Sequence, residues 1–168
     1  MRQLLKIFID ICLFRANAEQ LPYSFFLMML CIITYIIAGM ALSLINLSLN
    51  KAILIVGVDV AMMLSFIYTG LWIRSFFNRA IKTITAIAGT GTLFTVISLP
   101  LAMILTNQPK DQASIFSVIY YLLVAIWNVG VLGHILRGAL SMPLWVGITI
   151  ALMYFYVNIN VLRVLSLA

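Results

Sequence analysis

An aspartate inside a long apolar run is the residue of this chain best placed to do chemistry. Asp59 lies within the stretch from Ala52 to Ile73, and such a stretch can cross a bilayer because a hydrocarbon core of about 30 Å needs roughly 20 helical residues. A carboxyl group at the centre of a span costs about 2.5 to 3.5 kcal/mol on insertion scales, so it is usually functional or paired. Asp59 therefore needs polar neighbours.

Several polar residues of later apolar runs are expected at the same depth as Asp59. The candidate intramembrane polar site is Asp59, Tyr120, Tyr121, Asn158 and Asn160. Two interpretations stay open: a protonatable or cation-binding site that opens outward, or a structural hydrogen-bond node in which tyrosine hydroxyls and asparagine amides hold the acid. The lack of a second carboxylate or a basic partner at this depth favours the node.

Basic residues cluster where the run that holds Asp59 ends. We assign five residues to a candidate cytoplasmic face: Arg74, Arg79, Lys82, His134 and Arg137. Lys and Arg beside apolar spans are the usual signal for the cytoplasmic side. His134 is the one histidine of the chain, so we interpret it as a hydrogen-bonding group at the interface and expect no metal site.

Composition places the chain in a membrane. Of its 168 residues, 65% are hydrophobic and 8% are charged, whereas a soluble domain carries about 25% charged residues. The net charge of +6 comes from basic residues at the ends of apolar runs. This is the pattern of topology signals, so we expect no nucleic-acid partner.

Enzymatic chemistry finds no support in the sequence. No Ser/His/Asp set, acid pair, CxxC, Walker loop or GxGxxG can be assembled, and Gly89-Thr90-Gly91-Thr92 lies inside an apolar run. Such motifs act through a defined strand, turn and helix context that is missing here. We expect a protein that is not an enzyme and that uses no cofactor.

Five apolar runs predict the fold class. They cover about 25–47, 52–73, 83–105, 115–136 and 143–162, and each approaches or exceeds the length of a membrane span. We predict an all-α polytopic transmembrane bundle of five helices in residues 23–168. Small residues four apart, Gly39 with Ser43 and Gly57 with Ala61, predict close helix contacts. The third run carries many threonines and glycines and is expected to pack on several neighbours, and Pro100 is expected to kink it.

Residues 1–22 form a separate amphipathic segment. Leu4, Leu5, Phe8, Ile11 and Cys12 recur at helical spacing, with Arg2, Lys6 and Asp10 opposite. This pattern is typical of a helix in the membrane interface, and a helix packed on the inner face of the bundle is the alternative. Ser24 is expected to cap the helix that follows.

Counting Lys and Arg gives an orientation. With a cytoplasmic N-terminus and five spans, seven basic residues lie inside and three outside, so the C-terminus is expected outside. A four-span alternative with a re-entrant third run gives a slightly better count. Against it, the third run is uncharged and long enough to cross.

Two stretches resemble a known family. Arg74-Ser-Phe-Phe-Asn-Arg-Ala-Ile-Lys-Thr-Ile-Thr-Ala-Ile-Ala-Gly is similar to the basic aromatic loop and small-residue helix of the Yip family of membrane proteins. Ala125-Ile-Trp-Asn-Val-Gly-Val-Leu-Gly-His-Ile-Leu-Arg-Gly-Ala-Leu-Ser resembles their fourth helix and the turn into the fifth. The resemblance implies a five-helix membrane domain of bacterial inner-membrane type without a settled biochemical activity.

Taken together, these features predict a non-enzymatic integral membrane protein. We expect a scaffold, accessory subunit or membrane organiser that acts through helix contacts, with membrane lipids and other membrane-protein subunits, or a second copy, as partners. A small transporter or channel component that uses Asp59 and the outer polar cluster is the alternative.

Overall fold

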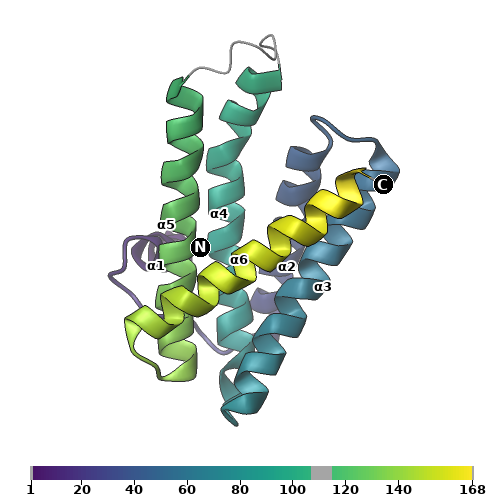
Figure 1. The fold of residues 1–168 in the computed structure, drawn as a ribbon. Coiled ribbons are helices and arrows are strands. Elements are labelled where there is room, and N and C mark those ends of the chain that lie inside the picture. Colours follow the sequence, from purple (N-terminus) through teal and green to yellow (C-terminus); the bar gives the residue numbers. More distant parts are fainter. Residues whose placement is uncertain (1, 107–114, 168) are drawn as a thin grey trace.

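The described part of the chain contains five long α-helices, one short α-helix and two 3₁₀-helices of three residues each. The computed structural model describes residues 2–106 and 115–167, which contain helices and turns but no strand (Figure 1). This confirms the predicted all-α bundle. The elements are α1 (Arg2–Cys12), η1 (Ala18–Gln20), α2 (Phe25–Ser43), α3 (Leu49–Ile73), η2 (Phe77–Arg79), α4 (Ala80–Thr106), α5 (Ile115–Leu140) and α6 (Leu144–Leu167).

The helices α2 to α6 are each long and apolar enough to cross a membrane. α4 is a single helix of 27 residues with Pro100 inside it, so it does not turn back as the re-entrant alternative required. The starts of α3 and α5 lie at one end of the bundle and the turn from α5 to α6 lies at the other (Figure 1). The chain is an integral membrane protein with five membrane-spanning helices.

Local capping explains where several helices begin and end. Ser24 caps α2 as expected, because its Oγ accepts the Leu27 N–H at 3.3 Å. Three residues with positive φ follow the ends of α1, α3 and α5, which are Phe14, Ser75 and Ser141. After each of them, the next N–H donates to the carbonyl five residues earlier: Arg15 to Asp10, Phe76 to Leu71 and Met142 to Arg137. This bond pattern is the Schellman stop, in which a left-handed residue ends a helix.

α4 lies at the centre of the bundle, in contact with α1, α2, α3 and α5. Its buried Thr83, Thr85 and Thr90 donate their hydroxyls to carbonyls one turn earlier, so they place no unsatisfied polar group between helices. A Cβ on Gly91 would lie 2.7 Å from Cε2 of Tyr35 on α2. The small residues of α4 therefore permit close approach on several sides, as the sequence predicts.

Two glycines bring α5 and α6 into backbone contact. A Cβ on Gly147 would lie 2.5 Å from the Gly133 carbonyl oxygen, and a Cβ on Gly133 would lie 2.9 Å from Cα of Ile148. Backbone atoms cannot move aside as a flexible side chain can. The oblique crossing of α6 against α5 (Figure 1) depends on these two positions.

We expect Gly147→Ala to separate α5 from α6 and to destabilise the protein by about 1–3 kcal/mol, the usual cost of overpacking. Gly57→Ala on α3 is the matched control, because nothing lies within 4 Å of its added Cβ. Thermal unfolding in detergent, followed by tryptophan fluorescence, measures both variants. Equal midpoints for the two variants would show that the α5–α6 contact is loose.

Candidate functional site at Asp59

Asp59 lies in the central part of α3 and is partly buried. At about 1.5 Å per residue, it is roughly 15 Å along the helix from Leu49 and 21 Å from Ile73. A carboxyl group at this depth lies far from the headgroups on either side. Its partners must therefore come from the protein itself or from enclosed water.

Side chains of two other helices hold the carboxyl group of Asp59. The Tyr35 hydroxyl of α2 donates to Oδ2 at 2.5 Å, and the Asn158 amide of α6 donates to Oδ1 at 2.7 Å. Both carboxyl oxygens are thus occupied, and the three helices are tied together at mid-membrane. The node interpretation of Asp59 is consistent with this geometry.

A cavity of about 90 Å³ adjoins the carboxyl group. Every membrane-spanning helix contributes at least one polar residue to the wall of this cavity. The apolar residues of the wall include Met63 and Leu132. The volume exceeds what one water molecule needs. The polar wall residues are Tyr35, Asp59, Thr90, Asn128, Tyr154 and Asn158.

The structure brings together two of the five residues expected at this site, Asp59 and Asn158. The Tyr120 hydroxyl instead donates to the Ile97 carbonyl at 3.1 Å, and Asn160 donates to the Tyr156 carbonyl of its own helix at 2.7 Å. Tyr121 is 40% exposed. Grouping all five was therefore wrong.

Helix geometry gives the reason for this correction. Side chains two positions apart on a helix point to nearly opposite sides. Asn160 therefore cannot join Asn158 beside Asp59. Tyr120 and Tyr121 lie about two turns before Asn128 on α5. Tyr154 could have been found from its spacing, because it lies four residues before Asn158 on one face of α6. Tyr35 gave no comparable signal, since its position against Asp59 depends on how α2 meets α3.

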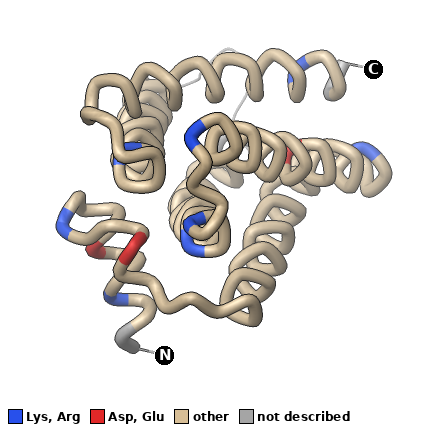
Figure 2. The backbone as a smooth tube through the Cα atoms, turned by 90° about the horizontal axis from the view of Figure 1, so that it is seen from below, with Lys and Arg blue, Asp and Glu red and all other residues tan. Residues whose placement is uncertain are grey.

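The basic residues meet at one end of the bundle, which faces the reader in Figure 2. Arg79 donates to the Gly138 carbonyl at 2.8 Å and forms an ion pair with Glu19 at 3.1 Å. Lys82 donates to the Glu19 carbonyl at 2.7 Å. These bonds fasten the segment after α1 to the end of the bundle where α3 meets α4.

His134, Arg74 and Arg137 complete the expected basic face. His134 is buried, with Nε2 3.0 Å from the Ala16 carbonyl oxygen, and Phe14 packs edge-on against its ring. Arg74 and Arg137 are exposed at the ends of α3 and α5. His134 thus anchors the N-terminal segment.

α1 packs into the bundle through one side. Phe8, Ile11 and Cys12 are buried, and the Phe8 ring lies against Gly89 of α4. Trp127 of α5 donates its indole N–H to the Cys12 carbonyl at 2.8 Å. α1 therefore packs against the sides of α4 and α5, partway along both helices, and not on the inner end face of the bundle.

The other side of α1 remains apolar and exposed. Leu5, Ile9 and Leu13 are 45–56% exposed and recur every four residues. Leu5 was expected on the packing side, and the structure turns it outward. This exposed stripe lies beside Leu93, Ile97 and Trp127, so it suits contact with lipid chains.

No protein-family model, curated protein or solved structure matches the chain.

Burial raises the pKa of the Cys12 thiol from 9.0 to about 11. A raised pKa lowers the thiolate fraction, and the thiolate is the form that reacts. In a Cys31→Ala background, we therefore expect Cys12 to react with N-ethylmaleimide at pH 8 about a hundredfold more slowly than an exposed thiol, with a rate that still rises toward pH 11.

Loosening α1 should restore the reactivity of Cys12. Phe8→Ala removes the buried ring, whereas Leu5→Ala changes a side chain that is 56% exposed and serves as the control. Alkylation rates are read by mass spectrometry. Fast labelling of the unaltered helix would mean that α1 is not packed on α4.

Proposed function

We propose that this chain is a non-enzymatic integral membrane protein that acts through contacts between transmembrane helices, as a scaffold, accessory subunit or membrane organiser. The observation that carries the proposal is a groove of about 490 Å³ between α3 and α6. Two residues of a small-residue row on α3, Ala61 and Ser65, line this groove. Such rows let the backbones of two membrane helices approach closely.

The row is Gly57, Ala61 and Ser65, four residues apart and all exposed. Nothing lies within 4 Å of a Cβ built on Gly57, whereas a Cβ on Gly39 would meet Val56 at 3.4 Å. Gly39 therefore serves packing inside the bundle, whereas the row of small residues on α3 is exposed. Met62, Met153 and Val157 add flexible apolar surface to the groove.

We propose a second copy of this chain as the occupant of the groove. An apolar helix with small residues on its contact face fits such a row, and α3 itself is such a helix. Two copies related by a twofold axis would bring the same surface together from both sides. Larger assemblies can then be built on this contact.

Ala61→Ile should weaken self-association about tenfold, because the branched side chain separates the two helices. Energy transfer between labelled copies in phosphatidylcholine vesicles, at a fixed protein-to-lipid ratio, measures the association. Ala41→Ile is the matched control, since Ala41 is an exposed alanine on α2 away from the groove. Equal loss in both variants, or no transfer in the parent protein, refutes the proposed contact.

We also propose an orientation and a place in the cell. The basic end with Arg74, Arg79 and Lys82 faces the cytoplasm, the C-terminus lies outside, and the membrane is a bacterial inner membrane. The positive-inside tendency supports this orientation. The resemblance of residues 74–89 and 125–141 to the Yip family supports the bacterial type of five-helix domain.

A second candidate function is a transport component that uses Asp59. The cavity beside the carboxyl group favours it, because water there could exchange a proton or a small cation with the acid. A monomer with five membrane-spanning helices offers little room for a transport pathway through its own interior. This candidate function therefore also calls for an oligomer.

Proton flux into vesicles separates this candidate from the first. If Asp59 carries protons, vesicles of the parent protein should acidify under an imposed potential, and Asp59→Asn should slow the flux at least tenfold. Asn160→Ala is the control, because Asn160 bonds within its own helix. Flux at the level of empty vesicles in the parent protein would leave Asp59 as a node.

A further inference from the structure

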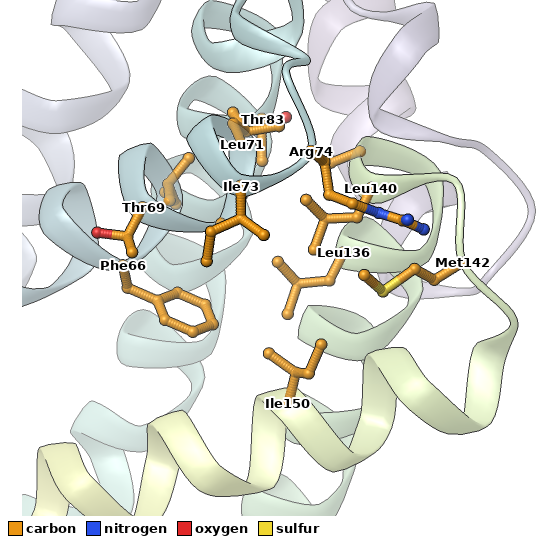
Figure 3. Close-up of a pocket in the computed structure, with 13 residues that line it drawn as sticks. Phe66, Thr69, Leu71, Ile73, Arg74, Thr83, Leu136, Leu140, Met142 and Ile150 are labelled. Atoms are coloured by element: carbon orange, nitrogen blue, oxygen red, sulfur yellow. The ribbon is translucent and has the colours of Figure 1, made fainter.

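A second pocket lies between α3, α5 and α6 at the basic end of the bundle (Figure 3). Its volume is about 230 Å³. Phe66 and Ile150 line one end of the pocket, and Arg74 and Met142 line the other. Arg74 follows Phe66 by eight positions, which is about 12 Å along the end of α3.

The wall of this pocket is apolar. Leu71, Leu136 and Leu140 are almost fully buried beneath it. The Thr83 hydroxyl donates to the Arg79 carbonyl at 2.9 Å, so it offers no bond to an occupant. A hydrocarbon chain is therefore the kind of group that the pocket can hold.

Arg74 places a positive charge at one end of the pocket. It is exposed at the end of α3 and lies beside Leu140 and Met142 in Figure 3. Within residues 2–106 and 115–167, its guanidinium has no hydrogen bond or ion pair, whereas that of Arg79 donates three hydrogen bonds and forms an ion pair. Arg74 is thus free to bind an anion at the level where headgroups lie.

We propose that this pocket binds one anionic phospholipid, with an acyl chain between α3 and α6 and the phosphate on Arg74. Arginine holds phosphate through paired, charge-assisted hydrogen bonds. Basic pockets between membrane helices on the cytoplasmic side recognise acidic headgroups in this way. The proposal goes beyond the helix contact at Ala61, because the two sites share only Phe66 among the α3 residues that line them.

Charge complementarity favours a lipid over a partner helix. A partner helix would fill the apolar part of the pocket but would leave the arginine without a counter-ion. An acidic lipid satisfies both parts in a single molecule. It also comes from the membrane in which the chain resides.

The test measures lipid that stays bound to the purified protein in mild detergent. The probes are dioleoylphosphatidylglycerol and dioleoylphosphatidylcholine, which share their chains and differ in headgroup charge, and native mass spectrometry counts the bound molecules. We expect the anionic lipid to bind about tenfold more tightly. Arg74→Gln should remove this preference, whereas Arg137→Gln, at an exposed arginine outside the pocket wall, should keep it.

A second pair of variants tests the apolar part. A Cβ on Gly70 would lie 3.8 Å from Leu140, within the pocket wall, so Gly70→Leu should fill the pocket and lower binding of both lipids at least fivefold. Gly138→Leu on α5 is the control, with nothing within 4 Å of its Cβ and no place in the pocket wall. Far-UV circular dichroism verifies the fold of each variant.

Three results would overturn the lipid site. They are equal binding of the two lipids, equal effects of the two arginine variants, and unchanged lipid binding in Gly70→Leu when the variant is folded. A change in the size of the purified complex in Gly70→Leu, with lipid binding unaltered, would assign the pocket to a protein partner instead.

Discussion

A polar group inside a lipid bilayer must find its hydrogen-bond partners within the protein, and Asp59 is where this constraint acts most strongly. Its carboxyl oxygens bind Tyr35 of α2 and Asn158 of α6. An unpaired group at this depth would cost several kcal/mol. These hydrogen bonds therefore help to set the positions of α2 and α6 relative to α3, together with the packing of α2 on α4 and of α6 on α5.

The same constraint shapes α4. Lipid is as apolar as leucine, so burying apolar surface does not by itself drive membrane helices together. α4 contacts its neighbours through threonines whose hydroxyls bond within their own helix. It also contacts them through glycines that leave room for an aromatic ring, as Gly91 does for Tyr35. Close packing and satisfied polar groups together replace the hydrophobic effect that stabilises a soluble core.

The sequence predicted the elements well and the contacts between them less well. Span length and hydropathy are local properties, so the five helices and the Ser24 cap could be predicted from consecutive residues. The partners of Asp59 depend on helix rotation and crossing. Depth along a helix placed Asn158 correctly, but it could not exclude Asn160 or reveal Tyr35.

The N-terminal segment shows how polar bonds and packing combine at the edge of the bundle. α1 is too short to span the membrane, yet Trp127, His134 and Lys82 all bond to backbone carbonyls of α1 or the segment after it. These bonds hold an amphipathic helix against α4 and α5 with its exposed stripe outward. The pocket near Arg74 and the groove beside Ala61 both lie between α3 and α6 and share Phe66 in their walls.

A double-mutant cycle between Tyr35→Phe and Asp59→Leu tests the central claim most directly. Each change removes one side of the bond that ties α2 to α3, and the free energy of unfolding in detergent is measured for the parent, both single variants and the double variant. We predict a coupling energy between about 0.6 and 1.7 kcal/mol, the mean and the maximum found for hydrogen bonds between membrane helices. Additive effects of the two changes would mean that the bond between Tyr35 and Asp59 does not hold α2 to α3, which contradicts the central claim.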